Sequence, residues 1–130
     1  MSDKQKTVML VDDDADLVFE LKLQLEAAGY SVVTAYSDKE GRELAGETLP
    51  DAAVVDLMME EHDSGFALSH YLRGQTPQMP IVLLTGVARE TGIDFGATTE
   101  EERSWIKADT VLDKPVRFET LQAELARLLS

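Results

Sequence analysis

The chain alternates short apolar runs with segments in which apolar residues recur every three or four positions. The run Thr7–Val11 shows no alternation with polar residues, which is typical of a strand buried on both faces of a sheet. From Ala15 onward apolar residues recur at helical spacing, and Gly29 follows as a candidate helix end. These two segments predict a strand followed by a helix.

The same order repeats along the rest of the chain. Further strands are expected at 31–35, 52–55, 81–84 and 111–112, and further helices at 37–47, 66–72 and 118–128. Ser37 and Glu40 have the spacing of a capping box, which marks the start of the second helix. Strands that alternate with helices call for a parallel sheet covered on both faces. We therefore predict an α/β fold with a doubly wound five-stranded parallel sheet.

Length and composition indicate one compact domain. The chain has 130 residues, of which 44% are hydrophobic, so we expect a single domain over 1–130 with its core at about 6–129. It has no cysteine, which excludes a disulfide framework, a thiolate zinc site and a thiol nucleophile. No apolar run approaches the roughly 18 residues of a membrane span, and residues 1–6 lack a signal-peptide core. We expect a cytoplasmic protein without a membrane partner.

The net charge limits the kinds of molecule that the chain can bind. Asp and Glu number 25 against 12 Lys and Arg, which gives a net charge of −13. Such a chain repels phosphate backbones and anionic membranes, so we expect no direct contact with nucleic acid. Its partners should be proteins or cations.

Polar side chains stand where four of the five predicted strands end. They are Asp12 with Asp13, Asp56, Thr85 and Lys114. In parallel sheets of this kind, ligands bind at the carboxyl ends of the strands. If the first and third strands are neighbours, the three aspartates converge, and each pair repels by roughly 4 kcal/mol at about 4 Å. A hard divalent cation relieves this repulsion. Mg²⁺ is such a cation, and it takes carboxylate, water and phosphoryl oxygens as its ligands.

The same strand ends suggest phosphoryl transfer. Carboxylates form acyl phosphates when cations neutralise the transferring group, and Asp56 is the natural nucleophile. Lys114 supplies a second positive charge, and the Thr85 hydroxyl can donate to a phosphoryl oxygen. Gly86 leaves the approach sterically open.

Four motifs stand in order at these strand ends: VDDD (11–14), VVDLM (54–58), LLTG (83–86) and DKPV (113–116). With them the chain resembles the receiver domain of two-component response regulators over about residues 6–129. The resemblance implies a flavodoxin-like, CheY-like three-layer sandwich with strand order 2-1-3-4-5. It also implies a stand-alone regulator that phosphorylation switches, with a contact to a downstream protein as its output.

The resemblance also assigns roles to residues. It implies a Mg²⁺ site formed by Asp12, Asp13, Asp56 and the backbone carbonyl of Met58. Asp56 would accept the phosphoryl group from a histidine kinase or phosphotransfer protein. Thr85 would move toward that group, and Lys114, whose bond to Pro115 is typically cis, would pair with its oxygens. We do not expect an enzyme with an external product, because such a domain catalyses only its own phosphorylation and dephosphorylation.

One residue departs from the family pattern at a position that matters for switching. Val111 stands where the family usually has an aromatic residue, so we expect the long connection 86–109, with Trp105, to carry the switching response.

Other polar residues are expected to have structural rather than functional roles. Asp14 is expected to cap the helix that follows it. His62 and His70 have no ligand spacing and are expected at the surface.

Two other functions use similar residues. A phosphohydrolase of the haloacid dehalogenase type also places Asp, Thr and Lys at strand ends, but it needs a second Asp where this chain has Met58. A flavodoxin-like cofactor carrier needs a phosphate-cradling loop after the first strand, and three aspartates there would repel the phosphate. Both remain alternatives to the receiver domain.

Overall fold

The computed structural model describes residues 5–56, 64–85 and 110–129, which contain a five-stranded sheet. Its strands are β1 (Thr7–Val11), β2 (Ser31–Ala35), β3 (Ala52–Asp56), β4 (Ile81–Thr85) and β5 (Thr110–Asp113). They lie in the order β2-β1-β3-β4-β5, and every neighbouring pair is parallel. The predicted fold class and strand order are confirmed.

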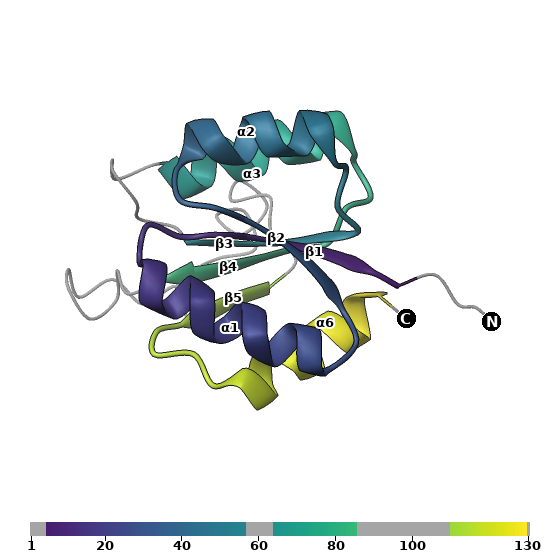
Figure 1. Ribbon diagram of the computed structural model, residues 1–130. Helices are drawn as coiled ribbons and strands as arrows, with labels where there is room; N and C mark the ends of the chain where they lie inside the picture. Colours follow the sequence, from purple (N-terminus) through teal and green to yellow (C-terminus); the bar gives the residue numbers. More distant parts are fainter. Residues whose placement is uncertain (1–4, 57–63, 86–109, 130) are drawn as a thin grey trace.

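Helices cover both faces of this sheet (Figure 1). The helices of the described residues are α1 (Ala15–Ala27), α2 (Asp38–Glu47), α3 (Ser64–Gln75) and α6 (Phe118–Leu129). Figure 1 shows α2 and α3 on one face, and α1 and α6 on the other. The described part of the chain is therefore a three-layer sandwich, as predicted.

The strands are continuous apolar runs because both of their faces are buried. In β1, Met9 and Val11 belong to one core cluster, which includes Leu68 of α3. Val8 and Leu10 belong to the other cluster, which includes Leu25 of α1 and Leu121 and Leu125 of α6. Successive residues of a strand point to opposite faces, so one strand supplies both clusters. The helices thus bury both faces of the sheet.

The ends of α1 and α2 have the capping residues that the sequence predicts. Asp14 caps α1 by accepting a hydrogen bond from Leu17 N at 3.2 Å, and Gly29 follows the helix at φ 104°. Ser37 caps α2 by accepting a bond from Glu40 N at 3.1 Å. Glu40 Oε1 in turn accepts a bond from Tyr36 N at 2.7 Å. In a standard capping box this glutamate would instead accept a bond from the N–H of the cap residue itself, which here is Ser37.

Helix α3 is longer than predicted. It runs from Ser64 to Gln75, whereas the apolar pattern indicated only 66–72. The first two residues of the helix, Ser64 and Gly65, and its last three, 73–75, are not apolar, so they extend the helix without extending the pattern. A pattern of apolar residues alone does not identify such positions as helical.

A polar cluster fastens β5 to α6 and so fixes the strand that precedes Lys114. Thr110 Oγ1 donates to Glu124 Oε1 at 2.9 Å, and Arg127 Nη2 donates to the same oxygen at 2.6 Å. Arg127 Nη2 also donates to Thr110 Oγ1 at 3.1 Å. The bonds from Arg127 and Thr110 stabilise the charged carboxylate and lower the pKa of Glu124.

This lowered pKa predicts an acid-dependent loss of stability. The Glu124 carboxylate contributes stability above its unfolded-state pKa of about 4.3, and the contribution is lost as the pH falls through the lower folded-state value. We expect Glu124→Gln to lower the free energy of unfolding at neutral pH by less than about 1 kcal/mol, since the group is partly exposed. Urea unfolding between pH 3 and 7 should show the difference shrinking toward pH 3. A difference independent of pH would contradict this role.

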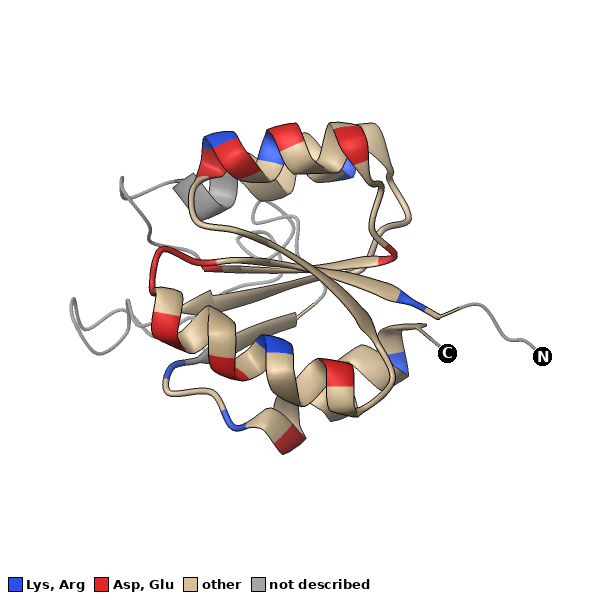
Figure 2. Ribbon diagram, in the orientation of Figure 1, with Lys and Arg blue, Asp and Glu red and all other residues tan. Residues whose placement is uncertain are grey.

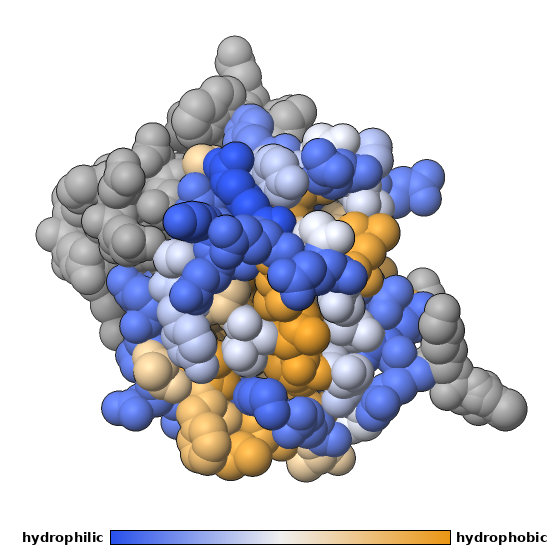
Figure 3. Space-filling model, turned by 45° about the horizontal axis from the view of Figure 1, so that its top comes forward, coloured by the Kyte–Doolittle hydropathy of each residue, from blue (hydrophilic) through white to orange (hydrophobic). Residues whose placement is uncertain are grey.

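The large apolar side chains that remain exposed include two on α1. Phe19 is 63% exposed and Leu23 is 52% exposed, one helical turn apart. Figure 3 shows hydrophobic residues gathered in a strip on the face that it draws, bordered by hydrophilic residues.

Among the described helices, none has the length and apolar character needed to span a membrane.

Candidate functional site

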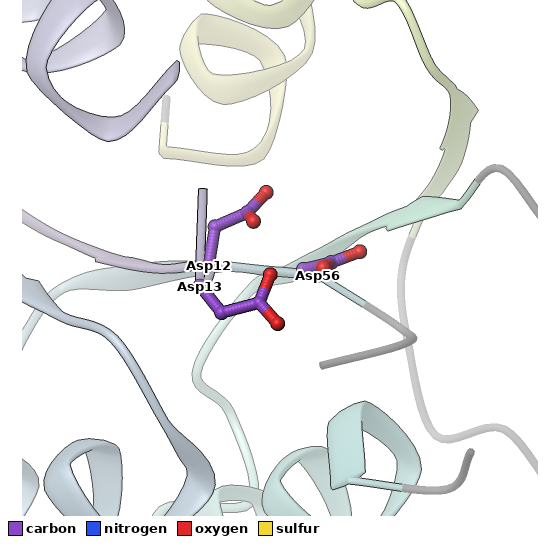
Figure 4. A group of neighbouring side chains, drawn as sticks. All are labelled: Asp12, Asp13 and Asp56. Carbon is purple, nitrogen blue, oxygen red and sulfur yellow. The ribbon is translucent and has the colours of Figure 1, made fainter. Parts of the chain in front are cut away.

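Three carboxylates meet at the carboxyl ends of β1 and β3. Asp12 and Asp13 follow β1, and Asp56 ends β3 (Figure 4). The register pairs Val11 with Val55, so Asp12 and Asp56 both come directly after paired residues. One oxygen from each of the three carboxylates lies within 4.8 Å of the others. The convergence expected from the strand order is therefore present.

The two members of the Asp12–Asp13 pair have different surroundings. Asp12 and Asp56 are each only 3% exposed, whereas Asp13 is exposed. The backbone holds Asp12 in place, since Asp12 N donates to Ala35 O at 3.2 Å. Asp12 Oδ1 accepts a bond from Asp14 N at 2.9 Å. The bond from Asp14 N thus fixes the orientation of the Asp12 carboxylate.

Lys114 brings a positive charge from the far edge of the sheet. Its backbone N donates to Thr85 O at 2.8 Å, and its peptide bond to Pro115 is cis. Its Nζ lies 2.9 Å from Asp12 Oδ2 and 3.3 Å from Asp56 Oδ1. Burial disfavours the ammonium charge, but the two carboxylates outweigh that effect and raise the pKa of Lys114 above its ordinary value. Lys114 is thus a charged bridge between two acidic strand ends.

Thr85 lies at the next strand end. It is fully buried, and it follows Leu84, which pairs with Asp56 in the register of β3 and β4. The Thr85 side chain thus lies at the same edge of the sheet as the carboxylates. The other predicted site features, Met58, Gly86 and the 86–109 connection with Trp105, lie outside the described residues.

The structure also shows where Val111 and His70 lie. Val111 is partly buried and packs against the core cluster of Met9 and Leu68. His70 is at the surface, as expected, and His62 lies outside the described residues.

The donor set fits a hard divalent cation. All three side chains offer carboxylate oxygens, the ligand type that Mg²⁺ prefers. Asp12 Oδ2 is buried and forms an ion pair with Lys114 Nζ at 2.9 Å. The Lys114 ammonium pairs with two of the three carboxylates, those of Asp12 and Asp56. Figure 2 shows the acidic colour in the turn from β1 to α1 and the basic colour between β5 and α6.

Two features of the site were missed by sequence reasoning. One is the direct ion pair of Lys114 with Asp12, since strand ends bring both residues to one edge but do not say which carboxylate the lysine pairs with. The other is the bond from Asp14 N to Asp12 Oδ1. Its signal was available, because aspartate side chains often accept a bond from the backbone two residues on.

Comparison with known proteins identifies the class of this fold and site. Residues 8–126 match the model of the response regulator receiver domain. The chain therefore belongs to the response regulator receiver domain family, whose members work in phosphorylation-activated two-component signalling. The phosphohydrolase alternative is not supported by these matches.

Particular relatives agree with this assignment. Transcriptional regulatory protein AfsQ1 of Streptomyces coelicolor is 35% identical over 123 residues, which make up 95% of this chain and 51% of that protein. The chain thus spans about half the length of this curated relative. A crystal structure of a putative response regulator from Chloroflexus aurantiacus has a TM-score of 0.80 and 30% identity, covering 97% of this chain and 98% of that one.

A further solved structure is relevant to the candidate metal site, because it contains a metal complex. Response regulator protein TrrA from Thermotoga maritima, crystallised in complex with Mg(2+)-BeF, has a TM-score of 0.77 and 25% identity. The match covers 96% of this chain and 100% of that one. In this chain, the acidic cluster of Asp12, Asp13 and Asp56 is the candidate site for a divalent cation.

Proposed function

We propose that this chain is a receiver domain in which Asp56 accepts a phosphoryl group in a Mg²⁺-dependent reaction. The observation that carries the proposal is the meeting of three carboxylates and one ammonium at a single edge of the sheet. Asp12, Asp13 and Asp56 would hold the cation, together with the backbone carbonyl of Met58. Mg²⁺ bound there would neutralise charge on the transferring phosphoryl group.

The side chains of this site suit an attack by Asp56. A carboxylate oxygen of Asp56 attacks phosphorus, and the bond from phosphorus to the donor nitrogen of a phosphohistidine breaks. The Lys114 ammonium, already 3.3 Å from Asp56 Oδ1, lies close enough to pair with a phosphoryl oxygen on that residue. Thr85, buried at the neighbouring strand end, supplies a hydroxyl donor. The product stays on the protein, so we propose a switch rather than an enzyme with an external product.

The partners follow from this chemistry. The donor would be a histidine kinase or a phosphotransfer protein, and the output would be a contact with a downstream protein. AfsQ1 is a transcriptional regulatory protein of about twice the length. For this chain we propose a single receiver domain that makes no direct contact with nucleic acid, because its charge of −13 opposes a phosphate backbone. We place it in the cytoplasm, where such kinases deliver the phosphoryl group.

Thermal denaturation with and without Mg²⁺ tests the metal site. A ligand that binds only the native state stabilises it by RT ln(1 + [L]/Kd). We expect the melting temperature of the parent chain to rise with Mg²⁺ and that of Asp13→Ala to rise much less. Asp16→Ala is the matched control, since Asp16 is an exposed acid of α1 outside the cluster. An equal response of Asp13→Ala and Asp16→Ala would show that Mg²⁺ acts elsewhere.

A further inference from the structure

A continuous chain of hydrogen bonds links the metal-site carboxylate of Asp12 to the first turn of α1. Asp12 Oδ1 accepts from Asp14 N at 2.9 Å. The side chain of the same Asp14 accepts from Leu17 N at 3.2 Å, and its backbone O accepts from Val18 N at 3.1 Å. Asp14 is therefore bonded on one side to the candidate metal ligand and on the other to the helix.

These bonds leave the Asp12 carboxylate little freedom. Its backbone N is tied to Ala35 O of β2, and its Oδ1 is tied to Asp14 N. The remaining oxygen, Oδ2, is buried and lies 2.9 Å from Lys114 Nζ. The orientation of Oδ2 thus depends on where the backbone N–H of Asp14 is held.

Asp13 is subject to the same constraint. It stands between Asp12, fixed to the end of β2, and Asp14, fixed to the start of α1. Its own side chain is exposed, so it relies on the backbone at both sides for its position. Loss of the cap at Asp14 would therefore loosen both members of the aspartate pair.

We propose that Asp14 is a positioning residue for the cation site, and that its capping bond, rather than its charge, sets how tightly the site binds Mg²⁺. This inference rests on the proposed metal site. Groups that orient metal ligands from outside the coordination sphere commonly change affinity by about 10–100-fold. Because Asp14 acts through the backbone, we expect an effect near the lower end of that range.

Two variants at Asp14 separate the cap from the charge. Asparagine caps a helix about as well as aspartate, and alanine caps poorly, while both remove the same negative charge. Isothermal titration of the full chain with MgCl₂ should give a Kd about tenfold higher for Asp14→Ala than for Asp14→Asn. Ser37→Ala removes the equivalent cap from α2, at the same end of the sheet, and should leave the Kd unchanged.

The outcomes are distinct. A Kd for Asp14→Ala within about twofold of Asp14→Asn would overturn the positioning role while leaving the metal site intact. An equal weakening in Ser37→Ala would also overturn it, since general loss of helix stability would then be the cause. A parent chain that binds no Mg²⁺ while remaining folded would overturn the metal site itself, and the inference with it. Melting temperatures of the metal-free variants show that each is folded during the titration.

Discussion

Acetyl phosphate with Mg²⁺ is expected to add one phosphoryl group to the parent chain and none to Asp56→Asn. The Asp56 carboxylate is only 3% exposed, shares a cluster with two other carboxylates, and lies 3.3 Å from the Lys114 ammonium. Asp12 is equally buried and is also paired with Lys114, so the choice of Asp56 as the acceptor comes from its match to the family motif. An amide is a far weaker nucleophile, so the variant should lose all detectable modification. Mass spectrometry of the intact protein measures the adduct.

Asp51→Asn is the matched control for this experiment. Asp51 precedes β3 at the opposite end of the strand, where its Oδ2 accepts a bond from Thr7 N at 2.7 Å. This variant makes the same chemical change on the same strand, and it should be modified like the parent. Modification of Asp56→Asn to the parent's level would mean that another residue is the acceptor.

Lys114→Met is expected to destabilise the metal-free protein and to strengthen its response to Mg²⁺. Removing the ammonium leaves Asp12 and Asp56, both buried, without their shared counter-ion. Breaking a fully buried pair costs 3–5 kcal/mol, and Lys114 is 26% exposed, so we expect a loss of about 2 kcal/mol. A cation in the cluster would replace the lost charge, so Mg²⁺ should raise the melting temperature of the variant more than that of the parent.

Lys22→Met controls for the loss of a lysine in an ion pair. Lys22 Nζ lies 3.0 Å from Glu26 Oε2 on the exposed side of α1, and pairs of this kind contribute less than about 1 kcal/mol. Urea unfolding in EDTA should therefore show a small effect for Lys22→Met and a large one for Lys114→Met. Equal effects would mean that the Lys114 bridge does not stabilise the metal-free fold.

The sheet could be predicted from the sequence because its strands are short, continuous apolar runs. Every residue of β3 and β4 is buried, so their patterns are unambiguous. The strand order came from the family resemblance rather than from the pattern. The ends of α3 could not be predicted, because polar residues in a terminal helical turn resemble those of a loop.

The candidate site was only partly predictable. Strand ends identified Asp12, Asp13, Asp56, Thr85 and Lys114, since parallel strands bring their carboxyl ends to one edge. The sequence does not distinguish Asp12 from Asp13, yet one is buried and the other is exposed. Asp12 N donates to Ala35 O and Asp12 Oδ1 accepts from Asp14 N, and both bonds need β2 and α1 to be in place.

The ion pair between Lys114 and Asp12 joins residues from opposite ends of the chain, and this has a consequence for folding. Contacts between residues far apart in sequence carry an entropic cost, because a long loop must close to form them. A chain emerging from the ribosome therefore has its first aspartates long before it has the lysine that faces them. Once β1 and β3 pair, we expect the carboxylates to repel one another without the lysine's charge until β5 pairs with β4.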